Sequence, residues 1–139
     1  MRIVIVAGEF NPPLPDRMVA AAMRKAKELG VTTEVVRVSG AWEIPLAVKA
    51  ALARRDVAAA VAIAAIVRGE TKHDELIAVA VADALMDLQL ATGKPIGLGI
   101  TGPGMTWKQA EARVDNAARA LAAAVRAAGA KGRNRSRPR

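Results

Sequence analysis

The sequence has no cysteine and only one histidine, His73, among its 139 residues. Without thiols the chain can form neither a disulfide framework nor a thiolate metal site. A single histidine also argues against a structural zinc site, because such sites take their protein ligands from cysteine and histidine. We therefore expect a protein that holds no metal ion.

Aromatic side chains are almost as scarce. Phe10, Trp42 and Trp107 are the only aromatic residues, although 53% of the chain is hydrophobic. The interior must consist mainly of Ala, Val, Ile and Leu, and such small side chains suit helices packed closely on a sheet. A chain of this length forms one domain with a sizeable core.

Long hydrophobic runs are missing too. The longest, residues 57–67, has 11 residues, whereas a membrane-spanning helix needs about 20. The apolar run after Arg2, residues 3–7, is too short for the hydrophobic part of a signal peptide. We expect a soluble, cytoplasmic protein with no membrane partner.

Positive charge is concentrated at the end of the chain. The formal net charge is +8, and five positive residues lie within the last nine positions: Lys131, Arg133, Arg135, Arg137 and Arg139. Without them the net charge is only +3. This distribution predicts a folded domain over residues 1–129 and a disordered basic tail over residues 130–139. The tail could attract RNA, but we do not expect RNA binding to be the function.

Strand and helix patterns alternate along the folded part. We expect strands at residues 2–7, 32–38, 58–67 and 95–101, and helices at residues 16–29, 43–54, 74–91 and 106–128. Strands apolar enough to be covered on both faces predict the α/β class: a single-domain α/β/α sandwich with a four-stranded parallel sheet, flavodoxin-like. Ligands of such sheets bind beyond the carboxyl ends of the strands. The loops expected there are residues 8–13, 39–42, 68–72 and 101–105.

The most informative stretch is residues 67–74. A buried strand ends at Val67 and a Gly/Thr-containing loop leads into the helix expected from Asp74. The first N–H groups of a helix have no helical partner, so this arrangement favours an anion. His73 lies next to this expected anion site, and an imidazole can act as acid and base near neutral pH. The stretch predicts an enzyme acting on a small phosphorylated substrate; a structural cap is the competing interpretation of His73.

Two helices carry unusual residues. The helix expected at 74–91 is apolar around most of its circumference, which predicts burial beyond its sheet side, most simply against another subunit. The helix expected at 106–128 has Arg113 at the edge of its apolar stripe, where an arginine needs a partner.

Four motifs together resemble a known family. They are Gly8-Glu9-Phe10-Asn11, residues 39–45 (SGAWEIP), residues 68–73 (RGETKH) and residues 99–106 (GITGPGMT). Their order and spacing are similar to those of lumazine synthase, over residues 2–128 and closest in motif to the archaeal branch. The resemblance implies condensation of 5-amino-6-(D-ribitylamino)uracil with 3,4-dihydroxy-2-butanone 4-phosphate in riboflavin biosynthesis, releasing phosphate and water without a cofactor.

The resemblance also implies roles for the residues around the pyrimidine ring. Phe10 would stack on the ring, and the Val67 backbone would contact it. Leu98 would supply an aliphatic second wall where bacterial members have an aromatic residue. The ribityl chain and ring edge would be held by Ala41, Trp42 and Glu43.

At the phosphate end, the resemblance assigns binding to the loop residues Gly69, Glu70 and Thr71. His73 would shuttle protons, and Arg113 of a neighbouring subunit would complete the phosphate site. Members of this family form homo-pentamers with sites between subunits, and some assemble into icosahedral shells of 60 chains. Whether this chain does so is left open, because it lacks the family's N-terminal extension.

Two other functions are alternatives for a sequence of this kind. One is the archaeal riboflavin synthase that resembles this family, and the intact Gly-Glu-Thr-Lys-His loop argues against it. The other is a non-catalytic flavin-binding or shell-forming protein. The loss of His73 or Arg113 would favour that alternative, and both residues are present.

Overall fold

The structure is a computed structural model that describes residues 1–69 and 72–136, with the backbone alone for residues 131–136. Its elements are, in chain order, β1 (Arg2–Gly8), α1 (Leu14–Glu28), β2 (Thr32–Val38), η1 (Ala41–Glu43), α2 (Ile44–Leu52), β3 (Ala59–Val67), α3 (His73–Thr92), β4 (Ile96–Met105), α4 (Trp107–Glu111) and α5 (Asn116–Ser136).

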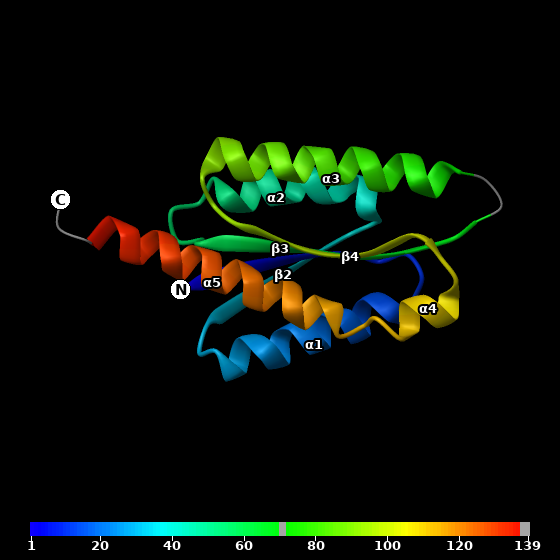
Figure 1. Ribbon diagram of the computed structural model, residues 1–139, viewed down its shortest axis with the longest axis horizontal. Helices are drawn as coiled ribbons and strands as arrows, with labels where there is room; N and C mark the ends of the chain where they lie inside the picture. The colour runs from blue at the N-terminus through cyan, green and yellow to red at the C-terminus, as the bar shows by residue number, and fades with distance from the viewer. Residues whose placement is uncertain (70–71, 137–139) are drawn as a thin grey trace.

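The four strands form one parallel sheet in the order β2-β1-β3-β4. Helices lie on both sides of it, α2 and α3 on one face and α1 and α5 on the other (Figure 1). The expected fold class, a flavodoxin-like α/β sandwich, is confirmed. β1 and β3 are the two central strands. After β1 the chain passes to the edge strand β2, and after β3 it passes to the opposite edge strand, β4.

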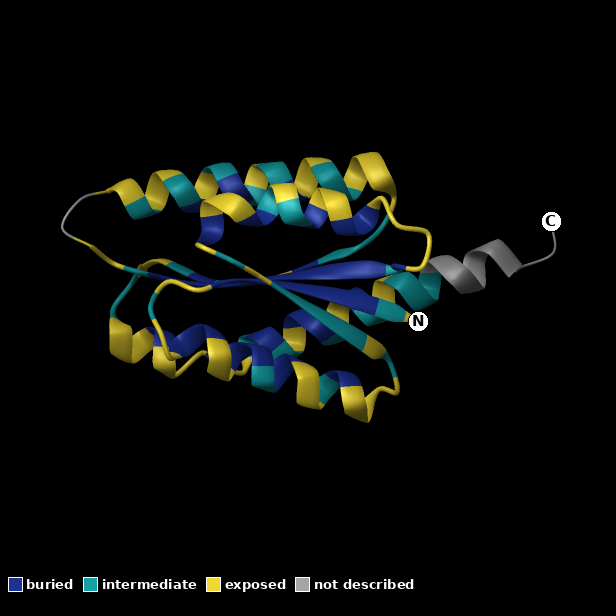
Figure 2. Ribbon diagram, turned by 180° about the vertical axis from the view of Figure 1, so that it is seen from behind, coloured by how far each residue is buried: buried dark blue, intermediate teal, exposed yellow. Residues whose placement is uncertain are grey.

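The core has two layers because successive side chains of a strand point to opposite faces. Ile3 and Ile5 face α1 and α5, whereas Val4 and Val6 face α2 and α3. β3 is buried along nearly its whole length, and its inner positions are mostly alanine. Figure 2 shows these strands as the buried layer between helices that expose their outer sides.

Glycine allows α5 to lie very close to β4. A Cβ atom added at Gly97 would collide with the backbone carbonyl of Ala120 on α5. A Cβ at Gly99 would lie 2.9 Å from the carbonyl oxygen of Ala62. A larger side chain at either position would therefore push α5 or the neighbouring strand away.

The last helix differs from the expectation. Instead of one helix over residues 106–128, the chain forms α4 and α5 with a turn between them. In this turn the amide nitrogens of Arg113, Val114 and Asn116 bond to carbonyl oxygens three residues earlier. No helix breaker occurs there, so the sequence carries no signal of the turn. The expected capping box at Thr106 and Gln109 is confirmed.

β4 is longer than expected. We expected a rigid loop after Thr101, but the strand continues to Met105 across a break in its register with β3. Gly102 and Gly104 make this continuation by adopting φ values of 106° and 76°, which other residues rarely adopt. A Cβ atom at Gly102 would collide with the carbonyl of Ile66, so glycine is needed for the close approach as well.

Helix boundaries also shift. α1 begins at Leu14 rather than at Asp16, because Pro15 fits in a first helical turn. α5 continues to Ser136, beyond the expected end at residue 128. The first part of the segment expected to be disordered, residues 130–139, is thus helical, since Ala, Arg and Lys favour a helix enough to offset two glycines. Residues 137–139 lie outside the described residues.

The amino-terminal edge of the sheet carries a small ion-pair cluster. Arg54 donates hydrogen bonds to Asp56 and to Glu34. The bond from Arg54 lowers the pKa of Asp56 below its ordinary value. These side chains are exposed, and exposed pairs contribute little to stability. No helix among the described residues is long and apolar enough to cross a membrane.

The contact between Gly97 and α5 can be tested by Gly97→Ala. We expect this substitution to lower the free energy of unfolding by about 1–3 kcal/mol, because one extra methyl group overfills a closed contact. Urea unfolding at equal protein concentration measures the loss. Ala123→Val, on the exposed side of α5, is the control and should cost less. Equal stability of Gly97→Ala and the unsubstituted protein would show that α5 can move away freely.

Candidate functional site

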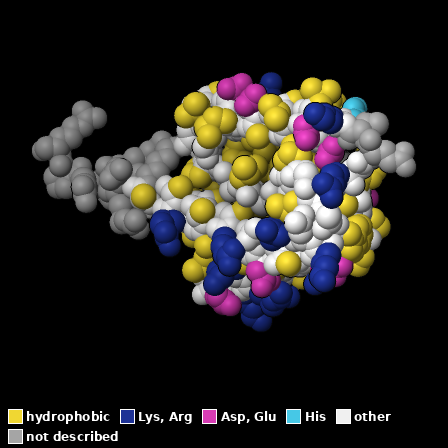
Figure 3. Space-filling model, turned by 45° about the vertical axis from the view of Figure 1, so that its right-hand side comes forward, with side chains coloured by type: hydrophobic (Ala, Val, Ile, Leu, Met, Phe, Trp, Pro, Cys, Tyr) yellow, Lys and Arg dark blue, Asp and Glu magenta, His cyan; other side chains and the backbone are white. Residues whose placement is uncertain are grey.

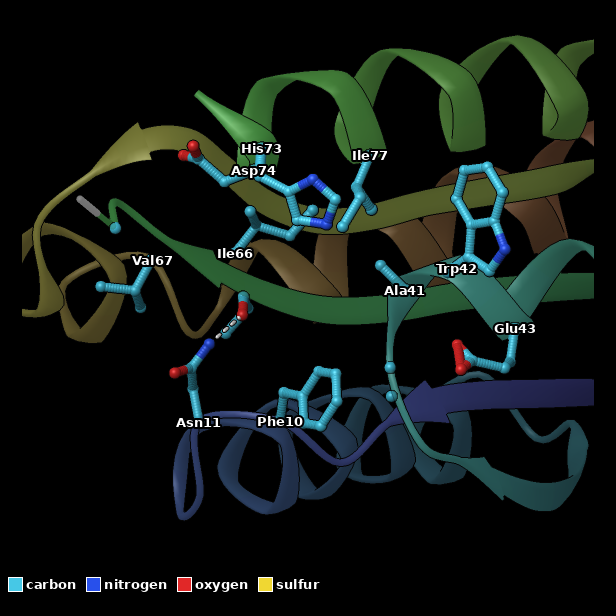
Figure 4. A pocket seen from close by; sticks show the side chains of 14 residues that line it. Phe10, Asn11, Ala41, Trp42, Glu43, Ile66, Val67, His73, Asp74 and Ile77 are labelled. Carbon is cyan, nitrogen blue, oxygen red and sulfur yellow. Dashed lines mark hydrogen bonds between the residues drawn. The ribbon is translucent and has the colours of Figure 1, made fainter. Parts of the chain in front are cut away.

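A cavity of about 370 Å³ opens at the carboxyl ends of β1 and β3, beneath the start of α3. This is the point from which the chain runs to opposite edges of the sheet, where neighbouring loops part and leave a crevice. Residues from four segments line it: Gly8, Phe10, Asn11, Gly40, Ala41, Trp42, Glu43, Ala65, Ile66, Val67, Gly69, His73, Asp74 and Ile77. Figure 4 shows the cavity from close by.

Phe10 is the aromatic wall of the cavity, and its backbone is held on both sides. The amide of Glu9 bonds to the carbonyl oxygens of Val38 and Ser39 at 3.0 and 3.1 Å. The Nδ2 atom of Asn11 donates to the carbonyl of Ala65 at 2.6 Å. Phe10 itself remains 66% exposed. A hydrophobic ring on a fixed backbone with an open surface is suited to stacking on a planar ligand.

The second wall is the short turn η1. Gly40 precedes it in an extended conformation, and the amide of Glu43 bonds to the carbonyl of Gly40 at 3.2 Å. Ala41 is buried while Trp42 and Glu43 are exposed. Trp42 also borders a second, apolar groove between α2 and α3. The turn therefore presents backbone groups and one carboxylate beside the cavity.

His73 is the first residue of α3, one position earlier than expected for the helix. Figure 4 shows its ring projecting into the cavity near Ile66 and Ile77, across β3 from Phe10. An imidazole in this place can exchange protons with a ligand that lies on Phe10. The N-terminus of α3 adds a partial positive charge on the same side of the cavity.

Asp74 follows His73 and also lines the cavity. Its Oδ2 atom is buried and has no hydrogen-bond partner among the described residues. Buried carboxylate oxygens normally have a donor, and the described residues do not supply one for this atom.

The structure brings together most of the predicted site. Seven predicted residues line the cavity: Phe10, Ala41, Trp42, Glu43, Val67, Gly69 and His73. Two predicted phosphate-loop residues, Glu70 and Thr71, lie outside the described residues. Leu98 and Arg113 do not line this cavity.

The positions of Leu98 and Arg113 are nevertheless informative. Leu98 lies on the edge strand β4 and is 58% exposed. Arg113 lies in the turn between α4 and α5, where its guanidinium donates to the carbonyl of Gln109 at 3.0 Å. The expectation that Arg113 sits at the edge of a continuous helical stripe is wrong, because the helix is interrupted there. Both residues are exposed, so another chain could reach them.

Several lining residues were not predicted. Asn11 belongs to the first motif, and its φ of 65° is a conformation in which asparagine is enriched. Ile77 lies four residues after His73, on the same face of α3. Asp74 could have been found from its place in the first turn of the helix. For Ile66 the sequence offers no signal other than its position near the end of a strand.

The described residues contain no group of three or more His, Cys, Asp or Glu side chains placed to hold a metal ion.

Comparison with known proteins gives a consistent result. Residues 1–131 match the family model described as 6,7-dimethyl-8-ribityllumazine synthase. A curated protein of that name from Staphylothermus marinus is 48% identical, over 89% of this chain and 83% of its own. Those from Archaeoglobus fulgidus and Methanopyrus kandleri are 44% and 43% identical, over 91% of this chain and 89% and 90% of theirs.

The role of Asn11 in holding the Phe10 loop can be tested by two substitutions. Asn11→Ala removes the bond to Ala65 and places alanine at positive φ, so we expect a loss of about 1–3 kcal/mol in the free energy of unfolding. Asn11→Gly removes the bond but fits the backbone, and should lose less. Thermal unfolding compares the two. If neither variant is destabilised, the hydrogen bond does not anchor the loop.

Proposed function

Because the chain belongs to the 6,7-dimethyl-8-ribityllumazine synthase family, we propose that the cavity between β1, β3 and α3 is its active site. The chain is a transferase of riboflavin biosynthesis. It condenses 5-amino-6-(D-ribitylamino)uracil with 3,4-dihydroxy-2-butanone 4-phosphate and releases phosphate and water. The riboflavin synthase and the non-catalytic alternatives are not favoured by these relatives. The observation that carries the proposal is the meeting of Phe10, η1 and His73 around one cavity.

The pyrimidine would bind against Phe10. Its planar ring would stack on the exposed face of the phenyl group, and the Val67 backbone would contact its edge. The ribityl hydroxyls would lie along η1, where the Glu43 carboxylate and the backbone of Ala41 and Trp42 offer hydrogen-bond partners. Held this way, the reacting amine would face the second substrate, and much of the rate enhancement would come from positioning.

His73 would transfer the protons. Formation of an imine between the amine and the ketone requires two protons to leave the nitrogen and two to reach the oxygen, which departs as water. The imidazole projects into the cavity on the side opposite Phe10, where it could serve both steps. The phosphate would bind at the loop with Gly69, Glu70 and Thr71, next to the N-terminus of α3.

The site would be completed by a neighbouring chain. Among the described residues lining the cavity there is no arginine or lysine, whereas a departing phosphate needs charge stabilisation. Leu98 lies on the edge strand β4 and Arg113 in the turn between α4 and α5, and neither lines the cavity of its own chain. We therefore propose that they serve the cavity of the adjacent subunit, as phosphate ligand and aliphatic wall.

Exposed hydrophobic residues support such an assembly. α3 buries only Ala78, Val81 and Leu85 in its own chain, and its residues Leu76, Val79, Met86 and Leu90 are all more than half exposed. The groove between α2 and α3 encloses about 600 Å³ and is largely apolar. Figure 3 shows hydrophobic side chains gathered around a hollow on one face of the molecule. Patches of this kind mark interfaces.

A contact between two different surfaces of the same chain generates a closed ring when the rotation permits. We propose a homo-pentamer on this basis and on the family, and leave an icosahedral shell of 60 chains as a prediction. Cytoplasmic location, the absence of a cofactor and a basic tail that is separate from the catalytic domain also stay predictions.

The catalytic proposal is tested by the rate of lumazine formation with both substrates, followed by fluorescence. The unsubstituted protein should exceed the uncatalysed condensation, and His73→Ala should lower kcat about 100-fold without abolishing activity, since general acid–base catalysis is worth about 10²–10⁴. Lys27→Ala, on the exposed side of α1, is the control. A rate no faster than the uncatalysed one would refute the proposed activity, and full activity of His73→Ala would refute the role of His73.

The shared site is tested by co-expressing His73→Ala and Arg113→Ala chains. If each site takes His73 from one chain and Arg113 from its neighbour, random mixing leaves about a quarter of the sites intact, and activity should recover to that fraction. If both residues serve a site within one chain, co-expression should restore nothing above the average of the two variants. Size-exclusion chromatography with light scattering confirms that the mixed chains assemble together.

A further inference from the structure

We propose that Gly40 is a positioning residue that sets the orientation of the Phe10 ring and so the affinity for the pyrimidine substrate. This inference rests on the proposed function, since it concerns the ring on which that substrate would stack. Gly40 itself offers no side chain to a ligand. Its influence would come entirely from the space that it leaves for Phe10.

The Phe10 ring occupies the place where a side chain at Gly40 would begin. A Cβ atom added at Gly40 would lie 2.5 Å from Cε2 and 2.6 Å from Cδ2 of Phe10. Real Cβ contacts are never this short, so the ring and a methyl group cannot both be present without movement. The three nearest atoms that such a Cβ would meet outside the adjoining residues all belong to Phe10.

The backbone does not require glycine at this position. Gly40 has φ −156° and ψ −172°, an extended conformation that any residue adopts. The glycine is therefore explained by its neighbour and not by its own torsion angles. Substitution by alanine should leave the fold intact and act on the Phe10 side chain.

The backbones of the two loops that carry Phe10 and Gly40 cannot move to make room for a methyl group at Gly40. Gly8 lies against the backbone of Gly40, so that a Cβ at Gly8 would be 2.9 Å from the Gly40 carbonyl carbon. The amide of Glu9 is bonded to the Val38 and Ser39 carbonyls, and Asn11 is tied to Ala65 on β3. With the backbone of both loops fixed, the Phe10 ring is the part that must turn.

A turned ring would present a different surface to the cavity. One edge of Phe10 now rests on the Gly40 backbone, and most of the residue is exposed. Stacking depends on the plane and offset of the two rings. A rotated phenyl group should thus weaken binding of the planar pyrimidine while leaving His73 in place.

A double-mutant cycle tests the inference, with Gly40→Ala, Phe10→Ala and the double variant in the lumazine assay. We expect Gly40→Ala to raise the KM for 5-amino-6-(D-ribitylamino)uracil about tenfold, a change typical of one lost stacking contact, with kcat changed less than about twofold. In the Phe10→Ala background the same substitution should change KM less than about twofold, because the colliding ring is gone. Ser39→Ala, an exposed neighbour that keeps its backbone carbonyl, should match the unsubstituted protein.

The inference is overturned if Gly40→Ala leaves KM unchanged or raises it equally in both backgrounds. Calorimetric titration with the pyrimidine measures binding to the same set of variants. An unsubstituted protein that binds the pyrimidine but does not catalyse the reaction would refute the proposed function, and the coupling of Gly40 to Phe10 would still be measured. Thermal unfolding separates misfolding from the proposed effect. A Gly40→Ala protein that fails to fold, and is not rescued by Phe10→Ala, would also contradict the proposal.

Discussion

The parallel pairing of β1 with β3 is the contact on which the rest of the structure depends. It joins the first strand to the third, so the second strand and the fourth must be added at opposite edges. The loops that leave β1 and β3 therefore part at their carboxyl ends and leave room for a ligand. Phe10 comes from one of these loops and His73 from the helix after the other. The cavity is thus a consequence of strand order before any particular side chain is considered.

The fold could be predicted from the sequence because its signals are local and repeated. Apolar, β-branched runs alternate with helical patterns, and small side chains such as those of Ala59–Val67 suit a strand covered on both faces. The errors occur where tertiary contacts override local preference. The turn after α4 contains good helix formers, and β4 passes through Gly102 and Gly104 because the sheet, not the local sequence, supplies its partner.

The candidate site was predictable to a similar extent. Phe10 could be placed at the site because the carboxyl ends of parallel strands share one edge, whereas the role of Glu43 was predicted only from the resemblance of its motif. The partners that hold these residues could not be foreseen. The bond from Asn11 to Ala65 spans 54 positions, and the contact of Gly40 with Phe10 joins two loops that only the folded sheet brings together. Arg113 and Leu98 do not line the cavity, and the use proposed for them in a neighbouring chain depends on contacts that no pattern within one chain reveals.

The glycine and alanine interior has a consequence for how this protein can vary. In most cores the damaging change is the loss of a large side chain, which leaves a cavity. Here many interior positions, from β3 to the contact of Gly97 with α5, have little or no side chain to lose. The harmful substitutions are those that enlarge a side chain, since a single added methyl group must displace a helix or a strand. Natural variants should accordingly differ widely on the outer faces of the helices, whereas the inner positions remain restricted to the smallest residues.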